Sequence, residues 1–333
     1  MLNGKSLYDK QVPPHFRLYI RTSETGSRGV VVLAFLVNVV IAISKTLAAV
    51  LTRSASMIAE SVHSWVDTGN EIFVLGAART ARRPADSSRP LGYGRESYVW
   101  ALFASIGGLV LGCALTIIQA LWRLHSGESP GKEGLTVSLV ILAISFLLEG
   151  SSFMQSVRTL KRQARKRQRG LFAQVLKTSD SSLVAVFTED FTALISIVIA
   201  ALGLSLSRLF GSSIIDILGA LLIGLLLGVS AIMLINKNRI FLEGRPFSRE
   251  LRASVIKRFL AMPEIYRVTF VYGEIIGPNR VLLVAGVELA GERTQSEAAI
   301  LLRKLEKRIA EENEDVGLVL LTLAAPDEED TVT

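Results

Sequence analysis

Long apolar segments separated by short polar connections fill most of the first 236 residues. Each segment, as a helix rising about 1.5 Å per residue, is long enough to cross about 30 Å of hydrocarbon. The pattern therefore predicts a membrane protein whose first domain, residues 29–236, is an all-α bundle of six transmembrane helices. The predicted helices are 29–51, 55–78, 98–124, 134–157, 183–206 and 213–236.

Residues 237–326 have a different pattern, in which strand-like runs alternate with amphipathic helical segments. Thr294 and Glu297 form a capping-box signature for a helix that ends near Asn313. The order of helix, two strands, helix and strand predicts a small α+β domain with helices on one face of its sheet. Its place in the chain suits a cytoplasmic regulatory or dimerisation module. The predicted elements are a helix at 251–262, strands at 265–272, 281–289 and 316–323, and the capped helix.

Composition and charge support a membrane protein with a defined orientation. Half of the residues are hydrophobic (50%) and the mean hydropathy is +0.43. Basic residues gather at 79–95 and 161–170, between alternate predicted spans, so the positive-inside rule places both basic loops and both termini in the cytoplasm. The run at 161–170 could touch anionic lipid headgroups, although a solvated loop is the preferred interpretation. The net charge of +7 does not indicate nucleic acid, because the basic residues lie between apolar runs.

The ends of the chain and its cysteine content add three expectations. Residues 1–28 are a polar, basic cytoplasmic segment without an apolar run like a signal peptide, so we expect insertion through the first span. Residues 327–333 form an acidic tail. Cys113 is the single cysteine, which excludes a disulfide or a thiolate metal site within one chain. We expect the protein in the cell (inner) membrane.

A polar stripe interrupts the second predicted span. Glu60, His63 and Asp67 recur at three and four residues and so share one face of a helix. An imidazole and a carboxylate four residues apart can bind one divalent ion of the zinc, manganese or iron type. The alternative is an inert, hydrogen-bonded stripe that lines a helix bundle. Glu60 is either a ligand or a structural carboxylate.

Other ionisable residues lie within or beside the spans. Lys45 is near the end of the first span and is expected to extend its ammonium group to the interface. Asp216 follows two serines and is interpreted as a helix-start residue or a functional one. Glu149 and Asp190 are expected to face the bundle interior, because charge is costly in hydrocarbon. Glycines of the third and sixth spans, such as Gly219, indicate close helix packing.

These motifs together resemble the cation diffusion facilitator family over nearly the whole chain. The motifs are the His63/Asp67 pair, the link KTLAAVLTRSASMIAESVHSWVD at 45–67, RPLGYGRES at 89–97, LEGSSFMQSVRTLKR at 148–162 and FTED at 187–190. The last two are most similar to the branch that includes zinc transporter nine. The resemblance implies six transmembrane helices followed by a cytoplasmic ferredoxin-like domain.

The resemblance also implies a tetrahedral transport site with two ligands from span two and two from span five. By position, His63 and Asp67 match the first pair and Asp190 matches the second ligand of span five. The remaining position falls on Val186, which has no donor atom.

Two other carboxylates are candidates for the missing ligand. Glu189 precedes Asp190, and consecutive helical residues point about 100° apart, so Glu189 is expected to contribute only if the helix is locally irregular. Glu60 is better placed on the stripe of the second span. The predicted metal ligands are therefore His63, Asp67 and Asp190, with Glu60 and Glu189 as candidates.

The sequence and its resemblance predict a transporter rather than an enzyme. The expected activity is proton-coupled export of a divalent metal ion, zinc first and Mn²⁺, Fe²⁺ or Co²⁺ as alternatives, with no prosthetic group. The expected partners are the metal ion, protons, the lipid bilayer and a second copy in a homodimer, without nucleic acid. No histidine or cysteine follows residue 236, so we expect the C-terminal domain to hold the dimer without bound zinc.

Two alternatives remain open. The first is a metal- or proton-sensing membrane protein that regulates a partner and transports nothing. The second is an intramembrane metal hydrolase with Glu60 as its base. It is disfavoured because the stripe E-x-x-H-x-x-x-D lacks the second histidine of H-E-x-x-H.

Overall fold

The computed structural model describes residues 28–81, 83, 85–126, 134–166, 170–313, 315–325 and 327–329. The predicted segment before Arg28, residues 167–169 of the basic run and residues 330–333 of the acidic tail lie outside the described residues. The chain divides into two compact units. One is a helical bundle that ends at Arg239, and the other combines Ala78–Tyr98 with the chain from Ile240 onward.

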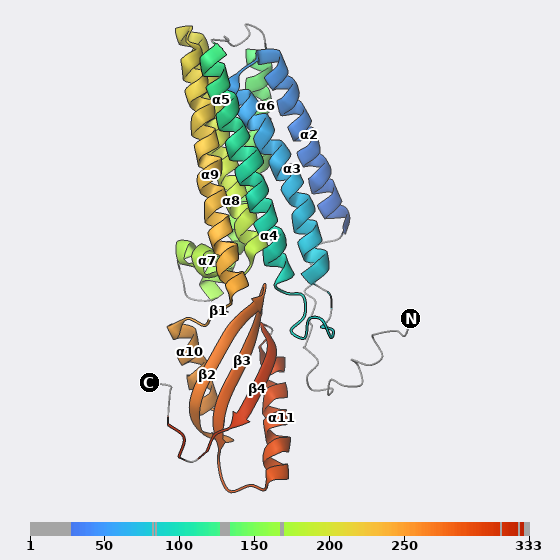
Figure 1. Cartoon of the computed structure of the whole chain (residues 1–333), viewed down its shortest axis with the longest axis vertical. Helices are drawn as coiled ribbons and strands as arrows, with labels where there is room; N and C mark the ends of the chain where they lie inside the picture. Colours follow the sequence, from blue (N-terminus) through green and yellow to red (C-terminus); the bar gives the residue numbers. More distant parts are fainter. Residues whose placement is uncertain are drawn as a thin grey trace. The chain divides into compact units, whose positions relative to one another are not determined.

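The bundle reproduces the six predicted helical segments (Figure 1). Among the described residues, five helical stretches are long and apolar enough to cross a membrane: α2, α4 to α5, α6, α8 and α9. The sixth segment, α3, has 27 residues but is not among those five. Its polar and ionisable residues, including the predicted stripe, interrupt its apolar character. The bounds are α2 (Arg28–Thr52), α3 (Ala55–Ala81), α4 (Glu96–Gly107), the π-helical turn η2 (Gly108–Ala114), α5 (Leu115–Ser126), α6 (Leu135–Lys166), α8 (Ser181–Phe210) and α9 (Ser213–Glu243).

The start of α3 is held by a side chain of α9. The Asp216 carboxylate accepts hydrogen bonds from the Ser54 hydroxyl at 2.7 Å, the Ala55 N–H at 2.5 Å and the Ser56 N–H at 3.3 Å. Because the first N–H groups of a helix have no partner within it, this carboxylate caps α3 from another helix. Asp216 lies in the first turn of α9, as predicted for a helix-start residue, and its carboxylate caps α3.

Glycine allows α9 to approach α3 at this point. A Cβ atom on Gly219 would lie 2.7 Å from the Ser56 hydroxyl, whose proton is donated to the Asp216 carbonyl at 2.8 Å. Any larger residue would push this bonded serine aside. The predicted packing role of the glycine is confirmed.

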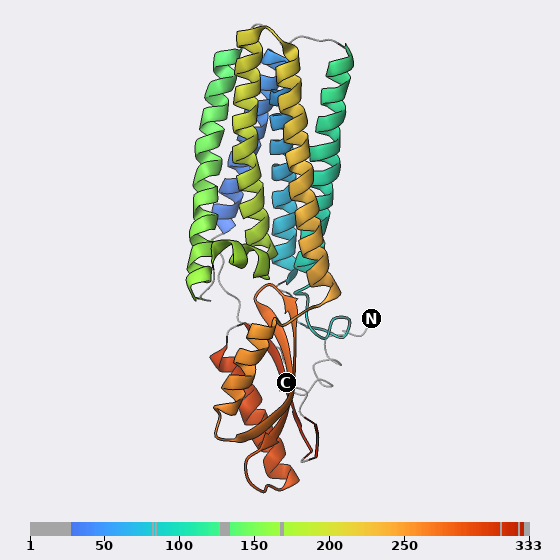
Figure 2. The same cartoon turned by 90° about the vertical axis from the view of Figure 1, so that its left-hand side faces the viewer.

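The connection between α6 and α8 was predicted as a basic loop, and this is wrong for much of it. The helix α6 continues to Lys166, nine residues past the predicted end at 157, because lysine, arginine and glutamine are good helix formers and no glycine interrupts the run before Gly170. A further helix, α7 (Leu171–Lys177), then lies across the end of the bundle (Figure 2). The sequence did not predict α7, because its 7 residues are too few to show a helical repeat of apolar positions.

The second unit is built on a sheet whose order is β1-β2-β3-β4. Neighbouring strands are antiparallel except for the parallel pair of β3 and β4. Helices α10 and α11 contribute Phe259 and Leu305 to one buried cluster with the sheet and so cover the same face (Figure 2). The predicted element order and the capping box of Thr294 are confirmed, whereas β1 was not predicted. The bounds are β1 (Arg245–Pro246), α10 (Arg249–Leu260), β2 (Ile265–Gly277), β3 (Arg280–Leu289), α11 (Gln295–Glu312) and β4 (Val316–Leu323).

The link between α3 and α4 belongs to this second unit. Arg95 forms an ion pair with Glu274 of β2. Within the link, Asp86 closes a turn by accepting hydrogen bonds from the hydroxyls of Ser88 at 2.6 Å and Tyr93 at 2.7 Å. These bonds lower the pKa of Asp86 to about 2, so the turn keeps its charged acceptor at neutral pH.

Candidate functional site

His63 and Asp67 form the centre of the candidate site. One helical turn of α3 places the His63 Nε2 atom 3.1 Å from the Asp67 Oδ2 atom. The imidazole is buried, with 3% of its side chain exposed, and the carboxylate is 25% exposed. The other ring nitrogen, Nδ1, lies 3.4 Å from the Ser196 hydroxyl of α8. The ring is thus oriented by contacts with α3 and α8.

A small cavity opens beside this pair, inside the bundle. Its volume is about 30 Å³, which is room for a water molecule or a single ion. Helices α3, α4, α8 and α9 and the π-helical turn at Gly108 form its wall. The polar side chains that line it are His63, Asp67, Asn70, Ser105, Glu189, Thr192 and Ser230.

Glu189 faces His63 and Asp67 across this cavity. Its Oε1 atom accepts a hydrogen bond from the Asn70 amide of α3 at 3.0 Å. Glu189 reaches the cavity from a regular helix, because α8 is an unbroken α-helix from Ser181 to Phe210. The prediction assumed that the face of α8 with Asp190 is the one that faces the site. In the fold, the face of α8 that contains Glu189 meets α3.

Asp190 faces another helix. Its Oδ2 atom accepts a hydrogen bond from the Ser152 hydroxyl of α6 at 2.8 Å. Neither Asp190 nor Val186, one turn earlier on the same face, is among the residues that line the cavity. Within the described part of the chain, no group of three His, Cys, Asp or Glu side chains is close enough to hold a metal ion together.

Glu60 is also turned away from the cavity. Its Oε2 atom lies 2.9 Å from the Nζ atom of Lys45, which is 3.1 Å from the Oε1 atom of Glu149. This ion network joins α2, α3 and α6. Lys45 is 1% exposed, so the prediction that it extends to the interface is wrong. Two carboxylates hold its charge inside the bundle, which offsets part of the cost of burial.

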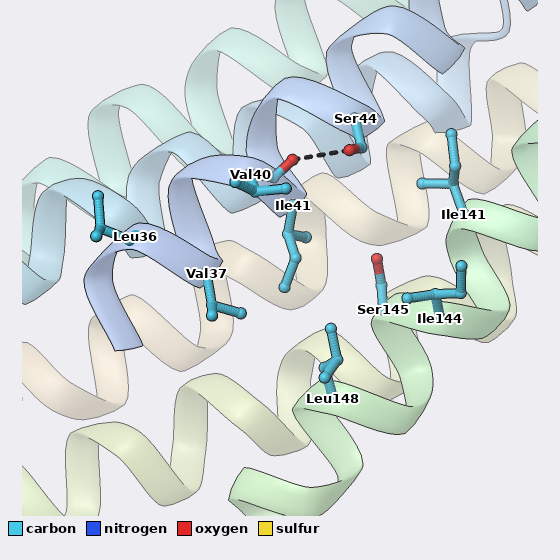
Figure 3. A pocket seen from close by; sticks show the side chains of 9 residues that line it. All are labelled: Leu36, Val37, Val40, Ile41, Ser44, Ile141, Ile144, Ser145 and Leu148. Atoms are coloured by element: carbon cyan, nitrogen blue, oxygen red, sulfur yellow. Dashed lines mark hydrogen bonds between the residues drawn. The ribbon is translucent and has the colours of Figure 1, made fainter. Parts of the chain in front are cut away.

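A larger cavity contains none of this chemistry. It lies between α2 and α6, has a volume of about 300 Å³ and is shown in Figure 3. Its lining is apolar except for Ser44 and Ser145, and the Ser44 hydroxyl donates a hydrogen bond to the Val40 carbonyl at 2.8 Å. The apolar cavity is therefore not a candidate for binding a metal ion.

Two serines that orient these groups were not predicted from the sequence. Ser152 and Ser196 lie on α6 and α8 and bond or contact the ionisable side chains across helix interfaces. Serine is frequent in apolar helices as a packing residue, so no single-sequence signal separates these two from the others.

Comparison with known proteins identifies the family. Residues 31–240 match the cation efflux transmembrane domain. The chain belongs to the cation diffusion facilitator family. This match covers nearly the whole bundle, including α3 and α8, and confirms the resemblance seen in the sequence motifs.

Individual members of the cation diffusion facilitator family show which branch is similar. Metal tolerance protein C4 of Arabidopsis thaliana is 31% identical over 244 residues, which are 72% of this chain and 52% of the relative. The human proton-coupled zinc antiporter SLC30A9, mitochondrial, is 29% identical over 267 residues, 80% of this chain and 46% of the relative. The metal cation efflux system protein CzcD of Cupriavidus metallidurans is 28% identical over 225 residues, 67% of this chain and 64% of the relative.

These relatives support the SLC30A9-like branch that the motifs at 148–162 and 187–190 indicated. The chain spans about half the length of the first two relatives. With five apolar helices among the described residues and a matching transmembrane domain, it is a multi-pass membrane protein.

Proposed function

We propose that this protein exports a divalent transition-metal ion, zinc first, in exchange for protons. The observation that carries the proposal is the contact of His63 with Asp67 beside a small cavity that Glu189 also lines. The names of the relatives support it: one is a proton-coupled zinc antiporter and another a metal cation efflux system protein. Manganese, iron and cobalt ions are alternative cargoes, because ligand type alone discriminates poorly among them.

The proposed cargo site uses one imidazole and two carboxylates. His63 supplies nitrogen and Asp67 supplies oxygen, a donor set that suits zinc. From α8, the geometry favours Glu189 as the second carboxylate, whereas the family resemblance implies Asp190. Two carboxylates would neutralise the charge of the metal ion where water is scarce. Once the metal ion has left, two buried carboxylates that both stay charged are energetically unfavourable. The imidazole can take a proton when the metal leaves, which links release to proton entry.

The proposed topology completes this mechanism. We infer that α3 is a sixth span, tolerated in the membrane because its polar face lies inside the bundle. Both termini and the basic connections then face the cytoplasm, consistent with the positive-inside rule. Residues 29–236 form the transmembrane domain, and 237–326 form a ferredoxin-like domain that joins two copies. Alternating access of the site to the two sides of the membrane would come from rocking of the helices around it.

Zinc flux into proteoliposomes with an imposed pH gradient tests the function. We expect parental protein to move zinc, and His63→Ala and Asp67→Asn to abolish flux while the proteins stay folded and keep their oligomeric state. Ser44→Ala, in the apolar cavity, is the matched control and should transport normally. Transport by either site variant at the parental rate would exclude the site.

The same proteoliposomes distinguish a transporter from the alternative, a metal- or proton-sensing protein that transports nothing. A sensing protein without transport activity would bind zinc in detergent and respond to pH, yet show no flux in vesicles. A competition series with manganese, iron and cobalt ions would rank the cargoes.

A further inference from the structure

The end of α6 has a basic face that the mechanism does not use. Arg158, Lys161, Arg162 and Arg165 recur at three, four and seven residues and so form one stripe. All four side chains are exposed. Among the described residues, none of the four has a carboxylate partner. We call these four residues the basic stripe.

The length of α6 places this stripe beyond the hydrocarbon. Its 32 residues at about 1.5 Å each make a helix about 48 Å long, whereas the hydrocarbon is about 30 Å thick. About twenty residues from Leu135 are enough to cross it. The remaining turns, from Gln155 to Lys166, exceed that length and contain the whole basic stripe.

Helix α7 packs against the end of α6 and presents exposed apolar side chains. Its inner residues Leu171 and Val175 pack in one cluster with Leu160 of α6 and Leu234 of α9. Its outer residues are four positions apart: Phe172 is 82% exposed and Leu176 is 59% exposed. An exposed pair of this kind on a solvated helix would keep much apolar surface in water.

Two contacts hold α7 in a fixed position at the end of the bundle. The amide of Gln174 donates a hydrogen bond to the Gln163 side chain of α6 at 3.0 Å. The Nζ atom of Lys237 on α9 donates to the Val175 carbonyl. The outer residues are therefore presented by a helix anchored to α6 and α9.

We propose that the end of α6 and α7 together form a lipid-binding surface at the membrane interface. The basic stripe binds anionic phospholipid headgroups, and Phe172 and Leu176 insert among the neighbouring acyl chains. Exposed basic side chains together with exposed apolar ones are typical of interfacial segments. An acidic soluble partner could also bind these basic side chains. Lipid is the preferred ligand because the stripe continues directly from an apolar span, which places it next to the bilayer surface.

This surface bears on the helix that lines the candidate site. Only residues 178–180 separate α7 from α8, which contains Glu189. The surface is therefore close in the chain to the start of α8. The inference uses the membrane position of the bundle and does not depend on transport.

The depth of α7 can be measured with a spin label on full-length protein. In a Cys113→Ala background, Phe172→Cys and Leu176→Cys each provide one labelling site, and Ile300→Cys on α11 is the control, an exposed apolar side chain of the sheet unit. In vesicles of phosphatidylglycerol and phosphatidylcholine, we expect labels at 172 and 176 to collide more often with dissolved oxygen than with a water-soluble nickel chelate. The label at 300 should show the reverse. Equal accessibility of all three labels to the nickel chelate would overturn the proposal.

The headgroup preference is measured with spin-labelled phospholipids. Parental protein should immobilise phosphatidylglycerol in preference to phosphatidylcholine. In the Lys161→Gln/Arg162→Gln variant, the preference for phosphatidylglycerol over phosphatidylcholine should fall about fivefold for each positive charge removed. Arg303→Gln/Lys304→Gln on α11 is the charge-matched control and should leave it unchanged. Equal immobilisation of both lipids by the parental protein, or equal loss in the two variants, would show that the stripe is a solvated face.

Discussion

Adjacent carboxylates of α8 face different neighbours at the scale of single residues. Glu189 accepts a hydrogen bond from Asn70 at the cavity with His63, and Asp190 accepts one from Ser152 on α6. The two directions follow from the turn of about 100° between consecutive helical residues. Of the two carboxylates, only Glu189 therefore lines the cavity with His63 and Asp67.

We expect Glu189→Gln to weaken zinc binding by at least about tenfold and Asp190→Asn to have a smaller effect, because only Glu189 lines the cavity. Zinc titration calorimetry on purified protein in detergent measures both. Ser152→Ala is the control for Asp190, since it removes the hydrogen bond of that carboxylate and leaves the cavity intact.

The Val186→His variant provides a second test of whether Glu189 or Asp190 is the zinc ligand from α8. Val186 shares the face of Asp190, so Val186→His adds a donor there and not at the cavity. If Glu189 is the ligand, zinc affinity of a well-folded Val186→His protein should stay at the parental value. Tighter zinc binding by this variant, together with weaker binding by Asp190→Asn, would place the site on the face of Asp190.

The buried network of Lys45 predicts a loss of stability. Lys45→Met leaves Glu60 and Glu149 inside the bundle without their shared cation, which should cost roughly 3–5 kcal/mol. The double variant Lys45→Met/Glu60→Gln restores the net charge of the network and should regain part of that loss. Thermal unfolding in detergent, followed by tryptophan fluorescence, compares them. A double variant no more stable than the single one would mean that the pairing contributes little.

At the scale of elements, α3 depends on another helix for its start. Local capping serves α8, where Asp180 accepts a hydrogen bond from the Leu183 N–H at 3.0 Å. The cap of α3 instead comes from Asp216 of α9, more than 150 residues away along the chain. This tertiary cap ties α3, with His63 and Asp67, to the end of α9.

We expect Asp216→Ala to destabilise the protein more than Asp180→Ala. The first change leaves several buried donors of α3 without an acceptor, at roughly 1–3 kcal/mol for each unsatisfied group, whereas the second removes one local cap at about 1 kcal/mol. The shift in unfolding temperature of the two variants under the same conditions is the measurement. Equal shifts would show that the tertiary cap is no stronger than the local one.

At the scale of the whole molecule, the expected homodimer should not depend on metal. The C-terminal segment contains no histidine or cysteine, the side chains that hold structural zinc. We therefore expect the mass of the purified protein, measured by light scattering during size exclusion, to remain that of a dimer after chelation. Monomers that reassemble when zinc is restored would contradict this prediction.

Local patterns in the sequence determined most of the elements, but not α7 or β1. The length of each apolar segment predicted the helices of the bundle, and Thr294 with Glu297 predicted the capped start of α11. The contact of His63 with Asp67 was equally local, because both belong to one turn of a helix. Such features depend only on residues within a few positions of one another.

Contacts between helices were decided by the tertiary structure. Glu189 rather than Asp190 lines the cavity, Lys45 pairs with Glu60 and Glu149, and Asp216 caps α3. A helix that is apolar on every side has no polar face to show which side meets its neighbours. The sequence therefore determined which residues were available for chemistry, and the packing of the helices determined which of them meet.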